Sequence, residues 1–240
     1  MPGFLALTGP PAVGKTTLSA QLTAVHGAQV FRLREFAQGF RHRPDADPAL
    51  FATEDPLGWF SDQTVRVLLD VALLGREPTG VTVLENLPGT VNQLRTISEI
   101  GRRIGLPVMV IELTAPDTIV IGRSLARRVC PACEPDLDAD PHRPAGAAAA
   151  DFENCVTCGN RLLRRRCDGT ALYELKLRRF RSRIPGIRRE AATLDLPYQA
   201  VNASASPDDC LGRVVAALRS TQILPCLPAD VSPALNGATP

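Results

Sequence analysis

The chain has 240 residues, of which 45% are hydrophobic and 22% charged, and its formal net charge at pH 7 is +2. These values are typical of a soluble globular protein, and the small net charge excludes a protein built to bind polyanions. The sequence has no apolar run long enough to span a bilayer, and its first ten residues lack the basic segment of a secretory signal. We therefore expect a cytoplasmic protein with no membrane contact.

Apolar runs alternate with helical patterns along the first half of the chain. Strands are expected at 4–8, 28–33, 81–85 and 107–113. Helices are expected directly after the first strand and at 57–74, 90–104 and 116–128. Residues 42–56, rich in proline and aspartate, predict a loop. Strands that alternate with helices indicate an α/β fold, a doubly wound parallel sheet covered by helices on both faces.

The alternation stops at 129–165, where cysteines, prolines and an alanine-rich stretch predict an inserted subdomain. A helical pattern resumes near Thr170 and runs to about Leu194, with an interruption expected at Pro185, and a last strand and helix are expected at 198–203 and 207–219. Proline-rich residues 221–240 are expected to be disordered. The predicted organisation is a core formed by 1–128 and 166–220, an inserted lid at 129–165, and a tail.

A complete phosphate-loop motif, Gly-x-x-x-x-Gly-Lys-Thr, follows the first predicted strand and precedes a helix. Its glycines let backbone N–H groups surround phosphate oxygens, Lys15 would reach the β- and γ-phosphates of ATP, and Thr16 would hold Mg²⁺. Lys15 is one of only two lysines in the chain, and we expect its stem to lie in a solvated loop. The residues predicted to bind ATP are Gly9, Pro10, Pro11, Ala12, Val13, Gly14, Lys15, Thr16 and Thr17.

Four of the seven cysteines form two Cys-x-x-Cys pairs, at Cys130, Cys133, Cys155 and Cys158. Two such pairs can place four thiolates around one Zn²⁺ in a closed structural site. A redox pair and a ribbon that no longer binds metal are the alternatives. The adjacent basic run 161–167 leaves nucleic-acid binding as another use of the ribbon, but aromatic stacking residues are missing there, and we do not expect it.

These features together resemble the adenylate kinase family over roughly residues 3–219. "GPPAVGKTT" is similar to the family's phosphate loop, and "LENLPGTVNQ" to its "DGFPRTxxQ" turn over the nucleoside monophosphate. "GRSLARRVCPAC" and "RRCDGTALYELKLRRF" resemble the segments where the chain enters and leaves the family's mobile zinc lid.

The resemblance implies an ATP-dependent kinase with three parts: a core, an acceptor-binding segment near 30–60, and a zinc lid. It places transition-state arginines at Arg123, Arg127 and Arg165, and the next such position at Lys176. Phosphoryl transfer spreads negative charge over several oxygens, so its catalysis depends on positioned cations. The resemblance also implies that Gln93 contacts a purine-like ring of the acceptor. From its position at the end of the third expected strand, Glu85 is predicted to lie near the metal or the acceptor, and Arg34 is predicted to bind the acceptor. We expect a monomer that acts on small molecules.

Two family arginines that hold the acceptor phosphate are absent, because Gln38 and Gly89 stand at their positions. Arg32, Arg34 or Arg41 could replace them, or the acceptor could lack a phosphate. The sequence therefore leaves three functions open: phosphorylation of a nucleoside monophosphate or a relative, phosphorylation of another small metabolite, and ATP binding without catalysis. If AMP is the acceptor, arginines restored at positions 38 and 89 should strengthen its use.

Overall fold

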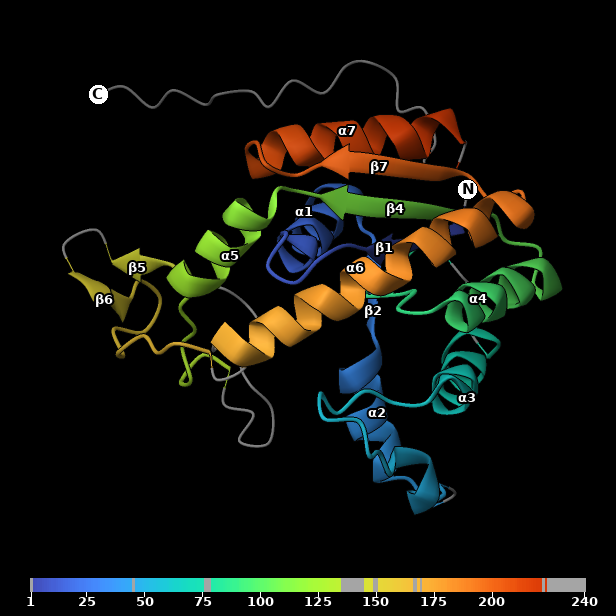
Figure 1. Ribbon diagram of the computed structural model, residues 1–240, viewed down its shortest axis with the longest axis horizontal. Coiled ribbons are helices and arrows are strands. Elements are labelled where there is room, and N and C mark those ends of the chain that lie inside the picture. Colours follow the sequence, from blue (N-terminus) through green and yellow to red (C-terminus); the bar gives the residue numbers. More distant parts are fainter. Residues whose placement is uncertain are drawn as a thin grey trace, which may run out of the picture.

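The computed structural model describes residues 2–44, 46–75, 79–134, 145–148, 151–165, 168, 170–221 and 223. Its centre is a five-stranded parallel sheet in the order β2-β3-β1-β4-β7 (Figure 1). The strands are β1 (Gly3–Thr8), β2 (Gln29–Arg32), β3 (Val81–Glu85), β4 (Val108–Thr114) and β7 (Tyr198–Asn202). The α/β fold with a parallel sheet is thereby confirmed.

Helices connect these strands and cover the sheet. They are α1 (Lys15–His26), α2 (Leu33–Arg41), α3 (Asp62–Leu73), α4 (Val91–Arg103), α5 (Asp117–Ala126), α6 (Thr170–Thr193) and α7 (Pro207–Ser220), with a short 3-10 turn, η1 (Pro48–Phe51). A separate antiparallel pair, β5 (Ala147–Ala148) and β6 (Asp151–Cys155), lies beyond α5, away from the main sheet (Figure 1).

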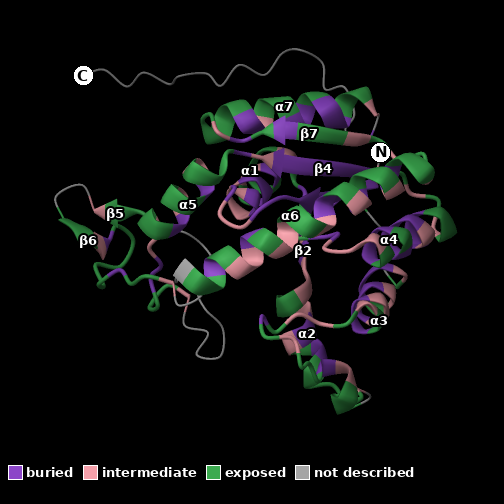
Figure 2. Ribbon diagram, in the orientation of Figure 1, coloured by how far each residue is buried: buried purple, intermediate pink, exposed green. Residues whose placement is uncertain are grey.

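Side chains that alternate along the strands form two cores, one on each face of the sheet. Figure 2 shows buried residues along β4 and on parts of the helices around the sheet. Leu5 and Leu7 of β1 pack with Leu18 of α1 and Leu218 of α7. On the opposite face, Phe4 packs with residues of α3 and α4, and Ala6 and Val110 pack with residues of α4 and α6. Both faces of the three central strands, β1, β3 and β4, are buried, which explains why their sequences are mostly apolar.

The strand order places β1 between β3 and β4. On one side of β1 the connections lead to β3 and β2, and on the other side to β4 and β7, so the direction in which strands are added changes at β1. Ligands of open parallel sheets bind at the carboxyl ends of strands beside such a reversal. The phosphate loop follows β1 there. The turn 86–90 follows Glu85, the last residue of the adjacent strand β3. The topology therefore brings these two motifs together.

Two predicted boundaries and one predicted helix interruption are wrong. The helix expected over 57–74 begins only at Asp62, because the Ser61 side chain accepts a hydrogen bond from the Thr64 backbone N–H and caps it there. Leu33 begins α2 and does not extend β2. Pro185 lies inside the continuous helix α6, where Ile184 and Ile187 are buried against the sheet. Packing on both sides of this proline outweighs its cost to the helix.

The structure includes no helix, among its described residues, that is long and apolar enough to cross a bilayer. Of the predicted tail, only Thr221 and Ile223 are described. The expectation that 221–240 is disordered therefore concerns residues that lie almost entirely outside the described part.

Candidate active site

A cleft of about 1640 Å³ runs over the carboxyl ends of β1 and β3. The loop residues predicted to bind ATP line it, apart from Pro10. So do all three predicted transition-state arginines, Arg123, Arg127 and Arg165, and the three predicted acceptor residues, Arg34, Glu85 and Gln93. The fold thus gathers residues that are up to 156 positions apart, from Gly9 to Arg165, around one cavity.

The phosphate loop depends on its two glycines. Gly9 has φ +152°, and a Cβ there would lie 2.7 Å from the carbonyl oxygen of Leu113, so a larger residue cannot fit. Gly14 has φ +111°, which L-residues rarely adopt, and it caps the start of α1. These conformations let the backbone turn sharply from β1 into a helix whose N-terminus faces the cleft.

Lys15 is buried, contrary to the solvated position expected for its stem. Its Nζ donates hydrogen bonds of 2.8 Å to the carbonyl oxygens of both Gly9 and Pro10. Burial lowers the pKa of Lys15 to about 7, although the nearby Glu85 acts in the opposite direction. The loop thus encloses its own ammonium group, and a bound phosphate would have to replace the two carbonyl oxygens as its partner.

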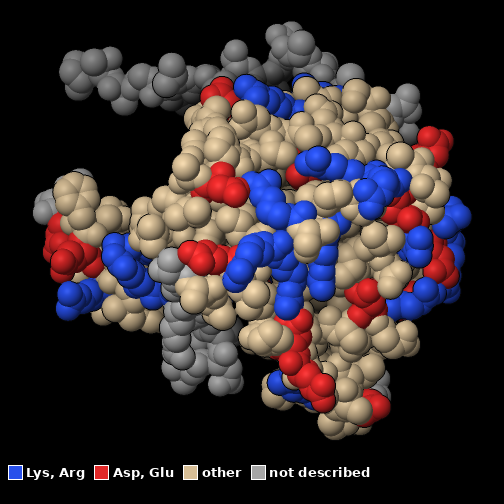
Figure 3. All heavy atoms as spheres, in the orientation of Figure 1, with Lys and Arg blue, Asp and Glu red and all other residues tan. Residues whose placement is uncertain are grey.

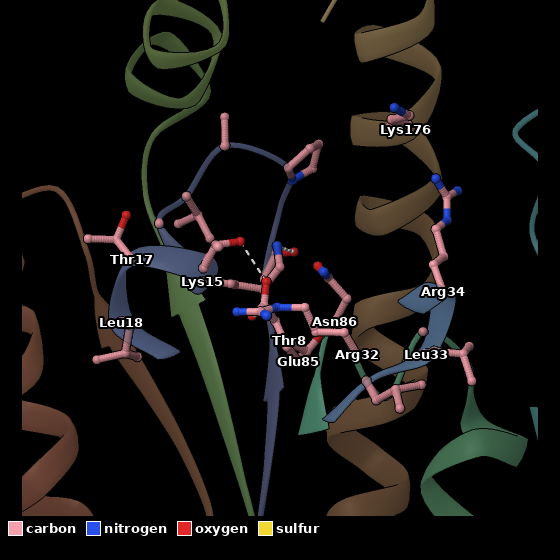
Figure 4. Close-up of a pocket in the computed structure, with 18 of the residues that line it drawn as sticks. Thr8, Lys15, Thr17, Leu18, Arg32, Leu33, Arg34, Glu85, Asn86 and Lys176 are labelled. Atoms are coloured by element: carbon pink, nitrogen blue, oxygen red, sulfur yellow. Dashed lines mark hydrogen bonds and ion pairs between the residues drawn. The ribbon is translucent and has the colours of Figure 1, made fainter. Parts of the chain in front are cut away.

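Glu85 joins the phosphate loop to the acceptor segment. Its Oε1 accepts a hydrogen bond of 2.6 Å from the Thr16 hydroxyl, and its Oε2 lies 3.0 Å from Nε of Arg32. Figure 4 shows Arg32 extending from the end of β2 toward Glu85, close to Lys15. The carboxylate is 3% exposed, so these partners compensate for the loss of its hydration.

The three arginines reach the cleft from the end of α5 and from the segment that precedes α6. Nη1 of Arg123 donates a hydrogen bond of 3.2 Å to the carbonyl oxygen of Val13, inside the phosphate loop. Nη1 of Arg127 lies 3.4 Å from a carboxylate oxygen of Asp168. Nε of Arg165 is buried and has no hydrogen-bond partner among the residues that the structure describes. Arg127 and Arg165 both lie near enough to Lys15 to contribute to the lowering of its pKa.

The residues predicted to bind the acceptor have different hydrogen-bond partners. Arg34 donates a hydrogen bond of 3.3 Å to the carbonyl oxygen of Leu57 and points along α6 toward Lys176 (Figure 4). Gln93 is 5% exposed, and both the oxygen and the nitrogen of its side-chain amide form hydrogen bonds. Its Oε1 accepts from the Gly89 backbone N–H at 2.7 Å, and its Nε2 donates to Asp62 at 3.0 Å. In this state Gln93 holds the Gly89 turn.

Sequence reasoning did not identify Trp59, Arg179 or Arg183 as residues of this region. The Trp59 ring lies beside Gly89, and both guanidinium carbons lie 4.9 Å from the ring centroid. Figure 3 shows Lys and Arg side chains gathered along α6 on this face of the molecule. Two sequence features could have drawn attention to them. Trp59 is the chain's one tryptophan, and the two arginines are spaced i, i+4 on a predicted helix.

The four predicted cysteine ligands come together. Their sulfur atoms all lie within 4.8 Å of one another, with Sγ–Sγ distances of 3.4 Å for Cys130–Cys158, 3.9 Å for Cys133–Cys155 and 3.5 Å for Cys133–Cys158. Four sulfurs placed tetrahedrally about 2.3 Å from a zinc ion would be ~3.8 Å apart. The cluster therefore has the dimensions of a metal site. Among the described cysteines, Cys210 lies apart from it, buried in α7.

The comparisons with known proteins agree with this geometry. No family model matches the chain. The adenylate kinase of Symbiobacterium thermophilum is 26% identical to it over 184 residues, which cover 74% of this chain and 81% of that protein. The phosphate loop, the parallel sheet and the four-cysteine cluster agree with this similarity in sequence. The chain is thus distantly similar to an adenylate kinase in its sequence.

Proposed function

We propose that the chain transfers the γ-phosphoryl group of ATP to a nucleoside monophosphate or a closely related acceptor. The observation that supports this proposal is the continuity of the cleft. Lys15, Arg123 and Arg127 line its phosphate-loop end, and residues of the segment 32–60 line the other. Direct transfer needs both substrates in one cavity, with the attacking and leaving oxygens in line.

The proposed catalytic groups are cations, because the transferring phosphoryl group carries its charge on peripheral oxygens. Lys15 would act at the β- and γ-phosphates, after exchanging the carbonyl oxygens of Gly9 and Pro10 for phosphate oxygens. Arg123, Arg127 and Arg165 would contact the same group from the lid side. The anchoring of Arg123 on the Val13 carbonyl keeps that guanidinium next to the loop before ATP binds.

Two oxygen donors, the Thr16 hydroxyl and the Glu85 carboxylate, lie 2.6 Å apart and suit the preference of Mg²⁺ for oxygen ligands. They would hold Mg²⁺, which when bound neutralises charge on the ATP phosphates. Arg32 fixes the second oxygen of Glu85 and so orients the carboxylate toward Thr16. We propose a structural Zn²⁺ for the cysteine cluster, supported by its sulfur spacing.

A second candidate function is phosphorylation of another small metabolite. Gln38 lines the cleft, and Gly89 offers no side chain to it. These two residues favour an acceptor that is held differently from AMP. ATP binding without catalysis is the third possibility. The monomeric state, the cytoplasmic location and the absence of nucleic-acid binding remain predictions from the sequence.

The test is acceptor-dependent formation of ADP from ATP and Mg²⁺. A panel of nucleoside monophosphates, nucleosides and sugars is supplied in turn, and the basal ATP hydrolysis is subtracted. Fastest turnover with a monophosphate supports the leading proposal, and fastest turnover with a nucleoside or sugar supports the second. Tight ATP binding with no acceptor-dependent turnover would overturn both and favour a regulator.

A further inference from the structure

The space beside Gly89 is filled by an aromatic ring. A Cβ built on Gly89 would lie 3.3 Å from Cζ3 of Trp59 and 3.2 Å from Oε1 of Gln93. Both distances are tighter than ordinary van der Waals contact. Any side chain at position 89 must therefore displace the indole or the Gln93 amide, so a cation cannot enter the cleft from this position without rearrangement.

Two arginines of α6 lie over the same ring but have different partners. Nη1 of Arg179 donates to both carboxylate oxygens of Asp55, at 2.8 and 2.7 Å, so its charge is already paired. Nη1 of Arg183 lies 3.5 Å from the carbonyl oxygen of Gly89. Within the described part of the chain Arg183 forms no ion pair with a carboxylate. Its positive charge is therefore available to a ligand.

One face of α6 lines the cleft. Lys176, Phe180, Arg183 and Ile187 recur at spacings of four, three and four residues, and all four line the cavity, whereas Arg179 does not. This spacing puts Arg183 on the cleft side of the helix. Stacking on Trp59 fixes its guanidinium there, and burial lowers the pKa of Arg183 through partial loss of hydration. A cation that has lost part of its hydration shell binds an anion more strongly.

We propose that Arg183 binds the anionic group of a phosphate monoester acceptor, supplying from α6 the cation that position 89 lacks. This inference rests on the proposed phosphotransfer and specifies its acceptor as a phosphate monoester. Trp59 closes the corner at Gly89 and holds the guanidinium beside that turn, and the Asp55–Arg179 pair fixes the segment that carries Trp59. A planar guanidinium can contact two oxygens of a phosphate at once.

Calorimetric titration tests the assignment, with the 5′-monophosphates AMP, GMP, CMP, UMP and dTMP as probes and the matching nucleosides as neutral counterparts. Fluorescence of Trp59, the one tryptophan in the chain, reports binding at this corner. We expect at least one monophosphate to bind about tenfold or more tightly than its nucleoside. Arg183→Gln should weaken that monophosphate about tenfold or more and change nucleoside and ATP binding less than about twofold. Arg183→Lys should recover part of the loss.

Arg189→Gln is the matched control, because Arg189 is exposed on the same helix and does not line the cleft. It should bind like the wild type. Unfolding midpoints of all three variants identify any loss caused by misfolding, and Arg183→Lys keeps the test valid if Arg183→Gln is unstable. Equal affinity of wild type and folded Arg183→Gln for the monophosphate would overturn the assignment. So would failure of every monophosphate to bind more tightly than its nucleoside.

Kinetic measurements distinguish failure of the Arg183 assignment from failure of the proposed phosphotransfer. If a monophosphate binds through Arg183 but ADP never forms in its presence, phosphotransfer is wrong and the binding assignment stands. If ADP forms with a monophosphate acceptor whose KM is unchanged in Arg183→Gln, phosphotransfer stands and the assignment is wrong.

Discussion

The indole of Trp59 packs against the backbone of Gly89, with its Cζ3 atom 3.3 Å from the place where a side chain at Gly89 would begin. The pair links a loop that precedes α3 to the turn that follows β3. It gives a physical reason why the turn after β3 carries no side chain at position 89: an aromatic ring occupies part of the volume that a side chain would need.

Enlarging Gly89 should therefore destabilise the protein through Trp59. We expect Gly89→Ala to lower the free energy of unfolding by ~1 kcal/mol or more, the lower end of the cost of overpacking. In a Trp59→Ala background the same change should cost less, because only the contact with Oε1 of Gln93, at 3.2 Å, remains. Chemical denaturation followed by circular dichroism gives the four values of this double-mutant cycle. Strictly additive effects would show that the two residues do not compete for space.

The same contact changes the expectation for restored arginines. With Trp59 in place, Gly89→Arg combined with Gln38→Arg should not strengthen AMP binding, although the sequence alone suggested that it would. The gain should emerge only when Trp59 is also replaced by alanine. Titration with AMP distinguishes the two cases, and improved binding in the variant that keeps Trp59 would contradict this account.

Replacement of Lys15 tests the phosphate loop. Lys15→Met should reduce phosphoryl transfer by roughly 100-fold or more, because one charged group that stabilises the transferring phosphoryl is lost. The fold should survive, since methionine fits the buried stem and removes an ammonium group whose burial is unfavourable. Steady-state kinetics and thermal unfolding measure the two effects. Near-normal turnover by the folded variant would be incompatible with the proposed role.

The cysteine cluster should contain one zinc ion per chain in freshly purified, reduced protein. Cys155→Ser should release the metal and increase amide hydrogen exchange first in residues 129–165. The reason is that only four described residues of this region are buried, namely Val129, Cys130, Cys155 and Leu162. The main sheet should keep its protection. Cys210→Ser serves as the control, and a metal content well below one ion in the wild type would contradict the prediction.

Acidification should loosen the loop that carries Trp59. The hydrogen bond from Arg179 is the main cause that lowers the pKa of Asp55. A carboxyl group whose pKa is lower in the folded than in the unfolded state stabilises the fold above its unfolded pKa, about 3.9, and this contribution is lost as the pH falls through the folded pKa. Between about pH 5 and pH 3 the unfolding free energy of the wild type should fall more steeply than that of Asp55→Asn.

Urea denaturation at several pH values measures these slopes, with Trp59 fluorescence as a local probe. Arg179→Met should also make the slope shallower than that of the wild type, because it removes the main cause of the lowered pKa. Its slope should remain steeper than that of Asp55→Asn, because the Leu57 backbone N–H still donates a hydrogen bond to the Asp55 carboxylate. Parallel slopes for the wild type and both variants would mean that the pair contributes nothing to the pH dependence.

The sequence by itself determined the sheet, the phosphate-loop motif and the four-cysteine cluster. Each depends on residues close together in the chain: continuous apolar runs predict buried parallel strands, the Gly-Lys-Thr loop lies between a strand and a helix, and two Cys-x-x-Cys turns carry their ligand spacing with them. The family resemblance, and not a local pattern, predicted Arg123, Arg127 and Arg165, and all three line the cleft.

Tertiary structure decided the acceptor side. The burial of Lys15, the continuation of α6 through Pro185, and the use of both ends of the Gln93 amide depend on packing between distant segments. The contacts between Trp59, Gly89 and Arg183 join residues separated by 30 to 124 positions. No local pattern encodes such contacts, because the effect of a side chain's volume and charge depends on the residues that the fold places beside it.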